Sequence, residues 1–187
     1  MDKHPLARRI VRAATDYPAI LASRLGDDAP AELIALGDPE LLRTHRTALF
    51  CSARAPGDAI LRAHDATRRM RDEGITVISG FHSPIEKECL HILLRGKQPI
   101  IICPARAIEA MRIPTECRSA FDAGRMLFLS PFTKEPKRVT KDSALRRNEL
   151  VAGLADEAYI PYLSSGGQTA QIAQMLVTWK VPLVAPS

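Results

Sequence analysis

Long apolar runs are missing from this sequence. No stretch approaches the roughly 20 residues that cross a bilayer, and the polar beginning, with Asp2 and Lys3, lacks the apolar core of a signal peptide. The cysteines have no C-x-x-C spacing, so neither a zinc site nor a disulfide framework is indicated. We therefore expect a soluble, cytoplasmic protein without membrane contacts, with reduced and mostly buried thiols at Cys51, Cys89, Cys103 and Cys117.

Signatures of nucleotide cofactors are missing too. No G-x-G-x-x-G follows the apolar run at residues 47–51, which argues against hydride chemistry, and the absence of a Walker loop argues against a P-loop NTPase. His82 lies close to Glu86, but no serine, cysteine or second carboxylate is placed by the sequence to complete a catalytic set. We predict a protein that is not an enzyme and needs no metal or cofactor.

Basic residues, by contrast, are plentiful in one part of the chain. The net charge is +5, and residues 101–150 carry ten basic and six acidic groups. Such a surplus attracts polyanions through counterion release, although a basic tract can also be a solvated loop that aids solubility. The tract lies close to a glycine-rich turn, which favours the binding interpretation, and its cations are Lys134, Lys137, Arg138, Lys141, Arg146 and Arg147.

Apolar runs and amphipathic stretches alternate from residue 47 onward. Short runs flanked by turn residues predict strands at residues 47–51, 75–79, 99–103, 126–130, 158–163 and 181–185. Helical patterns with capping or glycine stop signals lie between them, at residues 58–73, 83–96, 115–123, 143–155 and 168–180. Because parallel neighbours need crossover connections, this order predicts a Rossmann-like, doubly wound, mainly parallel sheet with helices on both faces over residues 47–187.

The first 46 residues differ from the rest. Apolar spacing of the helical kind occurs in residues 5–14 and around residues 33–36, interrupted by several prolines and glycines. We therefore expect residues 1–46 to form a separate lead-in of short helices.

Small, hydroxylated and basic residues follow the predicted strands. Ligands of open parallel sheets bind beyond the carboxyl ends of the strands, and the Arg147-Asn148 pair, near a helix start, would add a guanidinium to a glycine-rich turn. Purely structural roles remain open for three of these sites. Ser79-Gly80 can be an ordinary turn, Arg54 can pair with a surface carboxylate, and Phe81 can belong to the hydrophobic core. The candidate phosphate or nucleic-acid contacts are Ser52, Arg54, Ser79, Gly80, Phe81, His82, Lys134, Lys137, Arg138, Lys141, Arg147, Asn148, Ser165, Gly166, Gly167 and Thr169.

Four of these segments resemble the DNA-processing protein A (DprA/Smf) family. Cys51-Ser52-Ala53-Arg54 is similar to its Gly-Ser-Arg turn, and Val77-Ile78-Ser79-Gly80 to its next strand and turn. Arg147-Asn148 before Val151-Ala152-Gly153-Leu154 resembles its Arg-Asn-Arg-x-Ile-Ala-Gly-Leu element, and Ser165-Gly166 with Thr169-Ala170 its Ser-Gly-Ser-x-x-Thr-Ala turn. The chain departs from the family at Pro84-Ile85-Glu86, where Gly-Ile-Asp is usual, at Cys89-Leu90, where Ala-His is usual, and at Glu149, where a second arginine is usual.

The resemblance implies a protein that binds single-stranded DNA in a basic pocket, forms a homodimer and loads the RecA recombinase in transformation. Two alternatives come from the wider superfamily. One is a sensor of a small nucleotide ligand at the same edge of the sheet, and the other, ranked last, is a phosphoribohydrolase. The Pro-Gly-Gly-x-Gly-Thr turn and following glutamate of such hydrolases are not found around Ser165-Gly166-Gly167.

Overall fold

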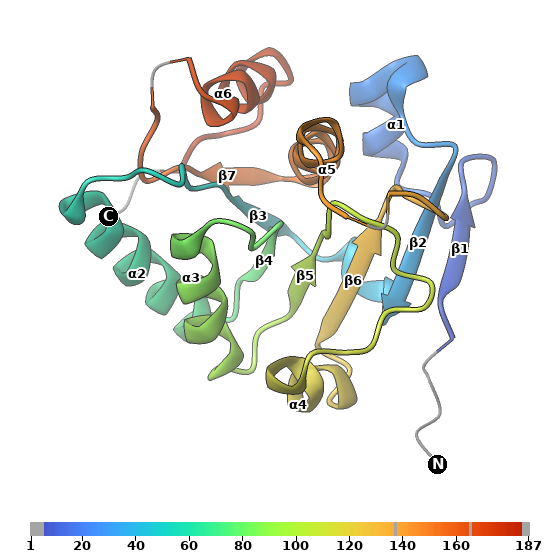
Figure 1. The fold of residues 1–187 in the computed structure, drawn as a ribbon, viewed down its shortest axis with the longest axis horizontal. Coiled ribbons are helices and arrows are strands. Elements are labelled where there is room, and N and C mark those ends of the chain that lie inside the picture. Colours follow the sequence, from blue (N-terminus) through green and yellow to red (C-terminus); the bar gives the residue numbers. More distant parts are fainter. Residues whose placement is uncertain (1–5, 137, 165, 185–187) are drawn as a thin grey trace.

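A single seven-stranded sheet forms the centre of the computed structural model, which describes residues 6–136, 138–164 and 166–184 (Figure 1). The strand order is β1-β2-β6-β5-β4-β3-β7, and the five strands from β6 to β7 run parallel. This confirms the predicted Rossmann-like, mainly parallel architecture. The parallel strands are β3 (Arg46–Leu49), β4 (Thr76–Ser79), β5 (Ile100–Ile102), β6 (Met126–Ser130) and β7 (Glu157–Tyr159).

The lead-in contributes strands where helices were expected. Strand β1 (Arg8–Val11) pairs antiparallel with β2 (Glu32–Gly37), and β2 pairs antiparallel with β6. The helix prediction for residues 5–14 and 33–36 is therefore wrong. Four successive buried residues, Leu33 to Leu36, suit a strand covered on both faces, and pairing with β6 outweighs the local helical spacing. The division into domains at residue 46 stays a prediction.

Short helices do occur in the lead-in and elsewhere between strands. Helix α1 (Ala19–Leu25) is followed by the 3-10 turns η1 (Gly26–Asp28) and η2 (Pro39–Arg43). The predicted helix at residues 115–123 is divided into a 3-10 turn, η3 (Thr115–Cys117), and α4 (Arg118–Asp122). The four longer helices match their predictions closely: they are α2 (Gly57–Asp72), α3 (Pro84–Leu94), α5 (Lys141–Leu154) and α6 (Gln168–Thr178).

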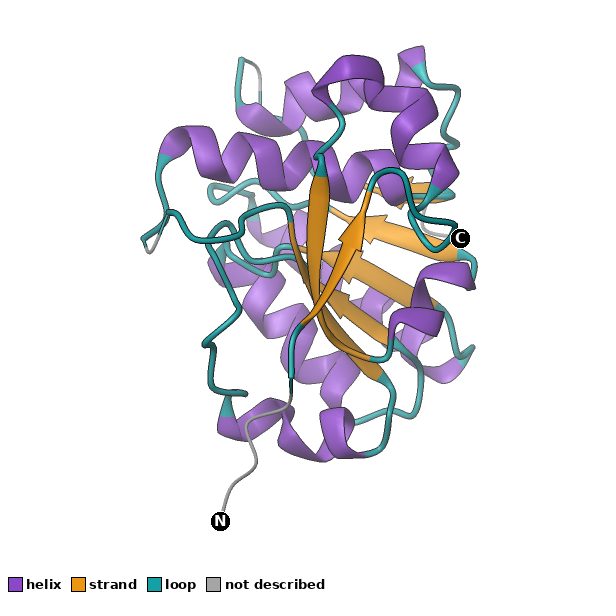
Figure 2. Ribbon diagram, turned by 90° about the vertical axis from the view of Figure 1, so that its right-hand side faces the viewer, coloured by secondary structure: helices purple, strands orange, loops and turns teal. Residues whose placement is uncertain are grey.

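Both faces of the sheet are apolar and covered by helices (Figure 2). Neighbouring strand residues alternate between two buried clusters, so that Val77 packs on one face and Ile78 on the other. Helices α1, α5 and α6 contribute to the cluster around Ile78, while α2, α3 and α4 contribute to the cluster around Val77. This two-sided burial explains why the parallel strands read as continuous apolar runs.

The strand predicted at residues 181–185 does not form over its described residues, 181–184. Leu183 makes only an isolated parallel bridge to Ala158, and residue 185 lies outside the described residues. Pro182 has no amide proton to donate to a ladder, which limits further pairing here.

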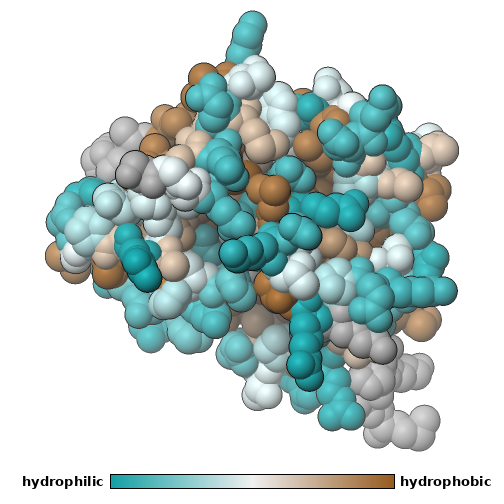
Figure 3. Space-filling model, turned by 45° about the horizontal axis from the view of Figure 1, so that its top comes forward, coloured by the Kyte–Doolittle hydropathy of each residue, from teal (hydrophilic) through white to brown (hydrophobic). Residues whose placement is uncertain are grey.

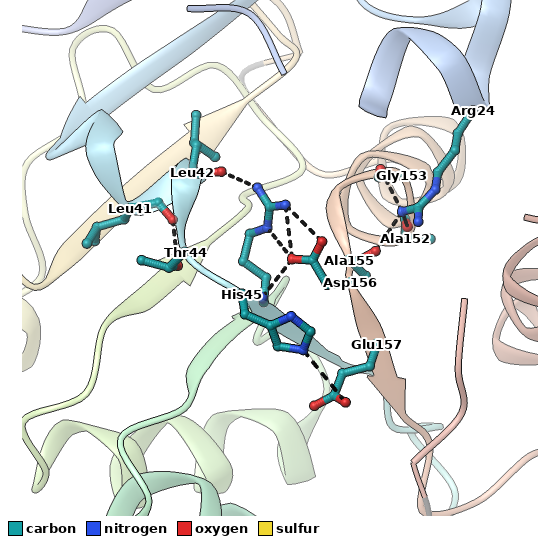
Figure 4. Close-up of polar contacts among 11 residues, drawn as sticks. Arg24, Leu41, Leu42, Thr44, His45, Ala152, Gly153, Ala155, Asp156 and Glu157 are labelled. Atoms are coloured by element: carbon teal, nitrogen blue, oxygen red, sulfur yellow. Dashed lines mark hydrogen bonds and ion pairs between the residues drawn. The ribbon is translucent and has the colours of Figure 1, made fainter. Parts of the chain in front are cut away.

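Two arginines fix the carboxyl end of α5 and the starts of β3 and β7 (Figure 4). Nη1 of Arg24 donates to the carbonyl oxygens of Ala155 at 2.6 Å and Gly153 at 3.1 Å, which satisfies the open carboxyl end of the helix. Buried Arg46 pairs with Asp156 at 3.0 Å, tying the first residue of β3 to the residue before β7. These contacts hold α5 across the sheet and bring β7 beside β3.

Candidate nucleic-acid interface

The strand order identifies one special position at the carboxyl edge of the sheet. From β3 to β6 each strand lies next to its predecessor, but the chain then crosses back and places β7 on the other side of β3. Ligands of doubly wound sheets bind where the direction of strand order reverses in this way. The loops after β3 and β7 therefore meet at the expected ligand position, which we call the β3–β7 junction (residues 50–56 and 160–169, Ser165 excepted).

Three hydroxyl groups meet at the β3–β7 junction. The Oγ of buried Ser52 lies 3.3 Å from the Oγ of Ser164 and donates to the Oγ1 of Thr169 at 3.1 Å. It also lies 3.4 Å from the carbonyl oxygen of Tyr162. Ser52, Ser164 and Thr169 form the hydroxyl cluster, which links the loop after β3 to the first turn of α6.

Two helices begin at this junction without a side-chain cap. Neither α2, which follows Pro56, nor α6, which follows Gly167, has a capping bond from the side chain of its N-cap residue. By contrast, α3 and α5 both carry complete capping boxes, from Ser83 with Glu86 and from Thr140 with Ser143. Uncapped first-turn amides and the helix dipole favour an anion, so both helix starts at the junction can accept a phosphate. In α2 the first turn also carries the carboxylate of Asp58.

The turn before α6 depends on its glycines. Gly166 has a φ of +71°, a left-handed conformation that other residues rarely adopt. A Cβ on Gly167 would lie 2.7 Å from the Oγ of Ser164 and would push against the hydroxyl cluster. The predicted contacts Gly166, Gly167 and Thr169 are thus brought together with Ser52, as the sequence suggested.

Arg147 lies at the carboxyl ends of β4 and β5, in the middle of α5 rather than near its start. Only 5 % of its surface is exposed. Its Nε donates to Oδ1 of Asn148 at 2.7 Å, and its Nη1 lies 3.5 Å from the carbonyl oxygen of Cys103. The guanidinium fills the space over Gly80, where a Cβ would overlap it. Among the described residues no carboxylate lies within 4.0 Å of Arg147, and its Nη2 donates no hydrogen bond.

Burial of Arg147 disfavours its positive charge. Desolvation lowers the pKa of the guanidinium, while the negative charge of Glu86 acts in the opposite direction. An arginine stays protonated under physiological conditions even so. A buried cation without a carboxylate at contact distance is a costly arrangement that an incoming anion would relieve.

Glu86 is the carboxylate whose charge acts on Arg147. Its Oε1 accepts a hydrogen bond from the amide of Cys51 at 3.0 Å, and its Oε2 accepts from the amides of His82 at 2.8 Å and Ser83 at 3.2 Å. Glu86 as a whole is 8 % exposed. It joins the loop after β3 to the loop after β4.

The other predicted contacts after β4 have structural partners. Buried Ser79 donates to the carbonyl oxygen of Leu49 at 2.7 Å and accepts from the amide of Phe81. Phe81 is buried in the α2–α3 cluster with a φ of +46°, so its ring is not exposed for base stacking. The side chain of His82 is exposed.

The predicted cations are mostly on the surface. Arg54, two residues after Ser52, is exposed, as are Lys134, Arg138 and Lys141. Lys137 and Ser165 lie outside the described residues. Arg146 stacks 5.7 Å over the ring of Phe132. On the face of the molecule shown in Figure 3, hydrophilic side chains predominate and apolar ones are scattered among them.

Glu149 is the acid that stands where the family pattern has a second arginine. It lies on α5 two residues after Arg147, on another side of the helix, and the charges that act on it are those of Asp28 and Arg146. Burial raises the pKa of its carboxyl, and Asp28 raises it further. The acid at this position therefore interacts with the charges of Asp28 and Arg146.

Two residues of the site were missing from the predicted set. Ser164 completes the hydroxyl cluster, and Glu86 binds three amides. The Ser83-Pro84-Ile85-Glu86 pattern predicts the bond to Ser83, but the bond to Cys51 spans 35 residues and has no local signal. Among the described residues no cluster of three metal-binding side chains occurs, and none of the described helices has the length and apolarity needed to span a bilayer.

The strand order defines a doubly wound α/β protein whose order of strands reverses at the β3–β7 junction. A profile of the family described as DNA recombination-mediator protein A matches residues 8–175. The chain therefore belongs to this family, as its motifs suggested. Family membership places it among DNA-processing proteins rather than enzymes.

Solved structures agree on the fold. DNA processing protein A from Streptococcus pneumoniae superposes with a TM-score of 0.77 at 17% identity, over 94% of this chain and 61% of that one. The protein from Helicobacter pylori, solved in work on its single-stranded DNA binding mode, gives a TM-score of 0.74 at 20% identity, over 96% of this chain and 80% of that one. This chain thus spans less than two thirds of the streptococcal chain. No curated protein sequence matches it.

Proposed function

We propose that this chain binds single-stranded DNA through its phosphates at the β3–β7 junction. The observation that carries the proposal is the pair of uncapped helix starts, at α2 and α6, on either side of the hydroxyl cluster. First-turn amides and hydroxyl groups donate hydrogen bonds to phosphate oxygens without reading a base. Binding of this kind has little sequence preference and depends strongly on salt.

Exposed cations supply the long-range attraction. Arg54 follows the hydroxyl cluster by two residues, and Lys141 begins α5, the helix that carries Arg147. Membership of a DNA-processing family, and the single-stranded DNA binding described for the H. pylori relative, support a nucleic-acid strand as the anion.

A titration with labelled oligo-dT at several salt concentrations tests the proposal. We expect Arg54→Ala to weaken binding and to reduce the slope of log K against log salt by about 0.7, the value for one lost phosphate contact on a single strand. The matched control is Arg118→Ala, an equally exposed arginine on α4, which precedes β6 and so lies at the opposite edge of the sheet. Equal losses in both variants, or none in either, would contradict the proposed site.

A nucleotide-sensing role is the second candidate. The hydroxyl cluster contains only three side chains. The hydroxyl oxygens of Ser164 and Thr169 lie 3.3 Å and 3.1 Å from that of Ser52, and a cluster of this size suits a single phosphate group. Thermal unfolding distinguishes the two. A mononucleotide at 100 times its dissociation constant should stabilise a sensor by about 2.7 kcal/mol, whereas the DNA-binding role predicts stabilisation by oligo-dT and little by a mononucleotide.

RecA binding and a homodimer are further proposals, supported by the family relationship alone. Sedimentation of the purified chain tests the homodimer, and co-sedimentation with RecA tests the partnership.

A further inference from the structure

The carboxylate of Glu86 takes the place that a phosphate would take at a third helix start, that of α3. It is bonded to the amides of His82 and Ser83, which precede α3, and to the amide of Cys51 after β3. These three donors come from two loops at the carboxyl edge, and all lie within 3.2 Å of a carboxylate oxygen. An anion of the chain itself therefore occupies donors next to the β3–β7 junction.

Capping alone does not require a charge at this position. In α5 the same capping box is built from Thr140 and Ser143, and the neutral Oγ of Ser143 accepts from the amide of Thr140 at 2.9 Å. A serine thus performs in α5 the capping role that Glu86 performs in α3. The negative charge of Glu86 must have another consequence.

That consequence concerns Arg147. Its guanidinium covers Gly80, two residues before His82, the first of the two successive residues whose amides Glu86 binds. No carboxylate lies within 4.0 Å of the guanidinium among the described residues, so Glu86 acts on it through space and not as a contact pair. The two opposite charges offset each other at the end of β4, and a phosphate approaching Arg147 would meet the negative carboxylate as well.

We infer that Glu86 is a specificity-determining residue of the proposed DNA site. It fills the amide donors after β3 and β4 and offsets Arg147, so that strand phosphates bind at the starts of α2 and α6 and are excluded from the start of α3. The inference rests on the proposed function. It adds a statement of which helix starts can bind the phosphates of a DNA strand.

Removing the charge tests this role. In Glu86→Gln the carboxylate is lost, and in Glu86→Ser the neutral cap of α5 is reproduced. We expect both variants to bind oligo-dT about fivefold more tightly at 0.1 M salt and to steepen the salt slope by about 0.7, because one further phosphate is contacted. Glu88→Gln is the matched control: it removes the same charge from an exposed position on the same helix and should leave the slope unchanged.

The outcomes separate the inference from the proposed function. If the parent binds oligo-dT and the folded Glu86 variants keep its affinity and slope, the inference is wrong and the DNA-binding role stands. If the parent itself shows no salt-dependent binding, both are wrong. A purely structural role would lower the midpoint of thermal unfolding and weaken binding, and that result also overturns the inference. Should Glu86→Gln fail to fold, Glu86→Ser, with its hydroxyl acceptor, provides the test.

Discussion

Because Gly80 has no side chain, the buried guanidinium of Arg147 can lie directly over its backbone. Arg147 occupies the space that any Cβ at residue 80 would need, and Ser79 fixes the backbone on the other side through its bond to Leu49. The sequence predicted both residues as contacts of a ligand. Because the guanidinium of Arg147 fills the space over Gly80, Gly80 serves the site through the position of Arg147.

Gly80→Ala should therefore displace Arg147. We expect a loss of about 1–3 kcal/mol in the free energy of unfolding, the usual cost of overpacking a buried site, measured by urea denaturation. Gly57→Ala is the control, because a Cβ on Gly57 has no atom within 4 Å. Equal stability of the two variants would show that the guanidinium moves aside freely.

The cysteines give a prediction for alkaline pH. Burial raises the pKa of Cys51 and Cys103 to about 12, while the thiols of the unfolded chain titrate near pH 8.5, an approximate reference value. The native state keeps protons that the unfolded state has lost, so the free energy of unfolding should be unaffected by these thiols below about pH 8.5 and fall as the pH rises toward about 12. Denaturation at a series of pH values measures this.

Thiol labelling provides the control for that prediction. All four cysteines are buried, so a thiol reagent should modify them in denatured protein and leave them unmodified in native protein at pH 8. Rapid modification of any one of them in the native state would contradict the burial on which the pH dependence depends.

At the scale of elements, the ends of α5 explain how this helix holds Arg147 in place. Its first turn has a complete capping box, and its carboxyl end is closed by Arg24 from α1, whose Nη1 donates to three carbonyl oxygens (Figure 4). A cation at a helix carboxyl end is also favoured by the dipole. The lead-in thus stabilises a helix more than a hundred residues further along the chain.

Arg24→Met should lower the free energy of unfolding by about 1–2 kcal/mol, because carbonyl oxygens at the end of α5 lose their donor. The control is Arg43→Met, which removes a highly exposed arginine that pairs only with Glu40 three residues earlier and should cost less than about 0.5 kcal/mol. Urea denaturation compares the two. If Arg24→Met lowers the free energy of unfolding by no more than Arg43→Met does, the capping role of Arg24 is contradicted.

Local patterns predicted the elements that local signals define. The capping box at Ser83 and the glycine stops located α2 and α3 within one or two residues, and the apolar runs located five parallel strands. Strands β1 and β2 were missed because their identity depends on antiparallel pairing: β1 pairs with β2, and β2 pairs with β6, which is distant in sequence. The same limit applies to the site: the Glu86 to Cys51 bond and the Ser52 to Ser164 contact join loops that no spacing rule connects.

At the scale of the whole molecule, the sheet separates two chemically different edges. The carboxyl edge carries the uncapped starts of α2 and α6 with the hydroxyl cluster between them. The opposite edge carries the ends of α2 and α3, where helix carbonyl groups disfavour an anion even though Arg71, Arg95 and Lys97 line a surface hollow there. The account therefore predicts that a polyanion binds one edge despite basic residues at both.

Amide chemical-shift mapping of the 15N-labelled chain during titration with oligo-dT tests this most directly. We predict the largest changes at the amides of Gly57, Asp58, Gly167, Gln168 and Thr169, with little change at Gly74 and from Arg95 to Gln98. Changes centred on Arg95 to Gln98, with the first turns of α2 and α6 unaffected, would contradict the account.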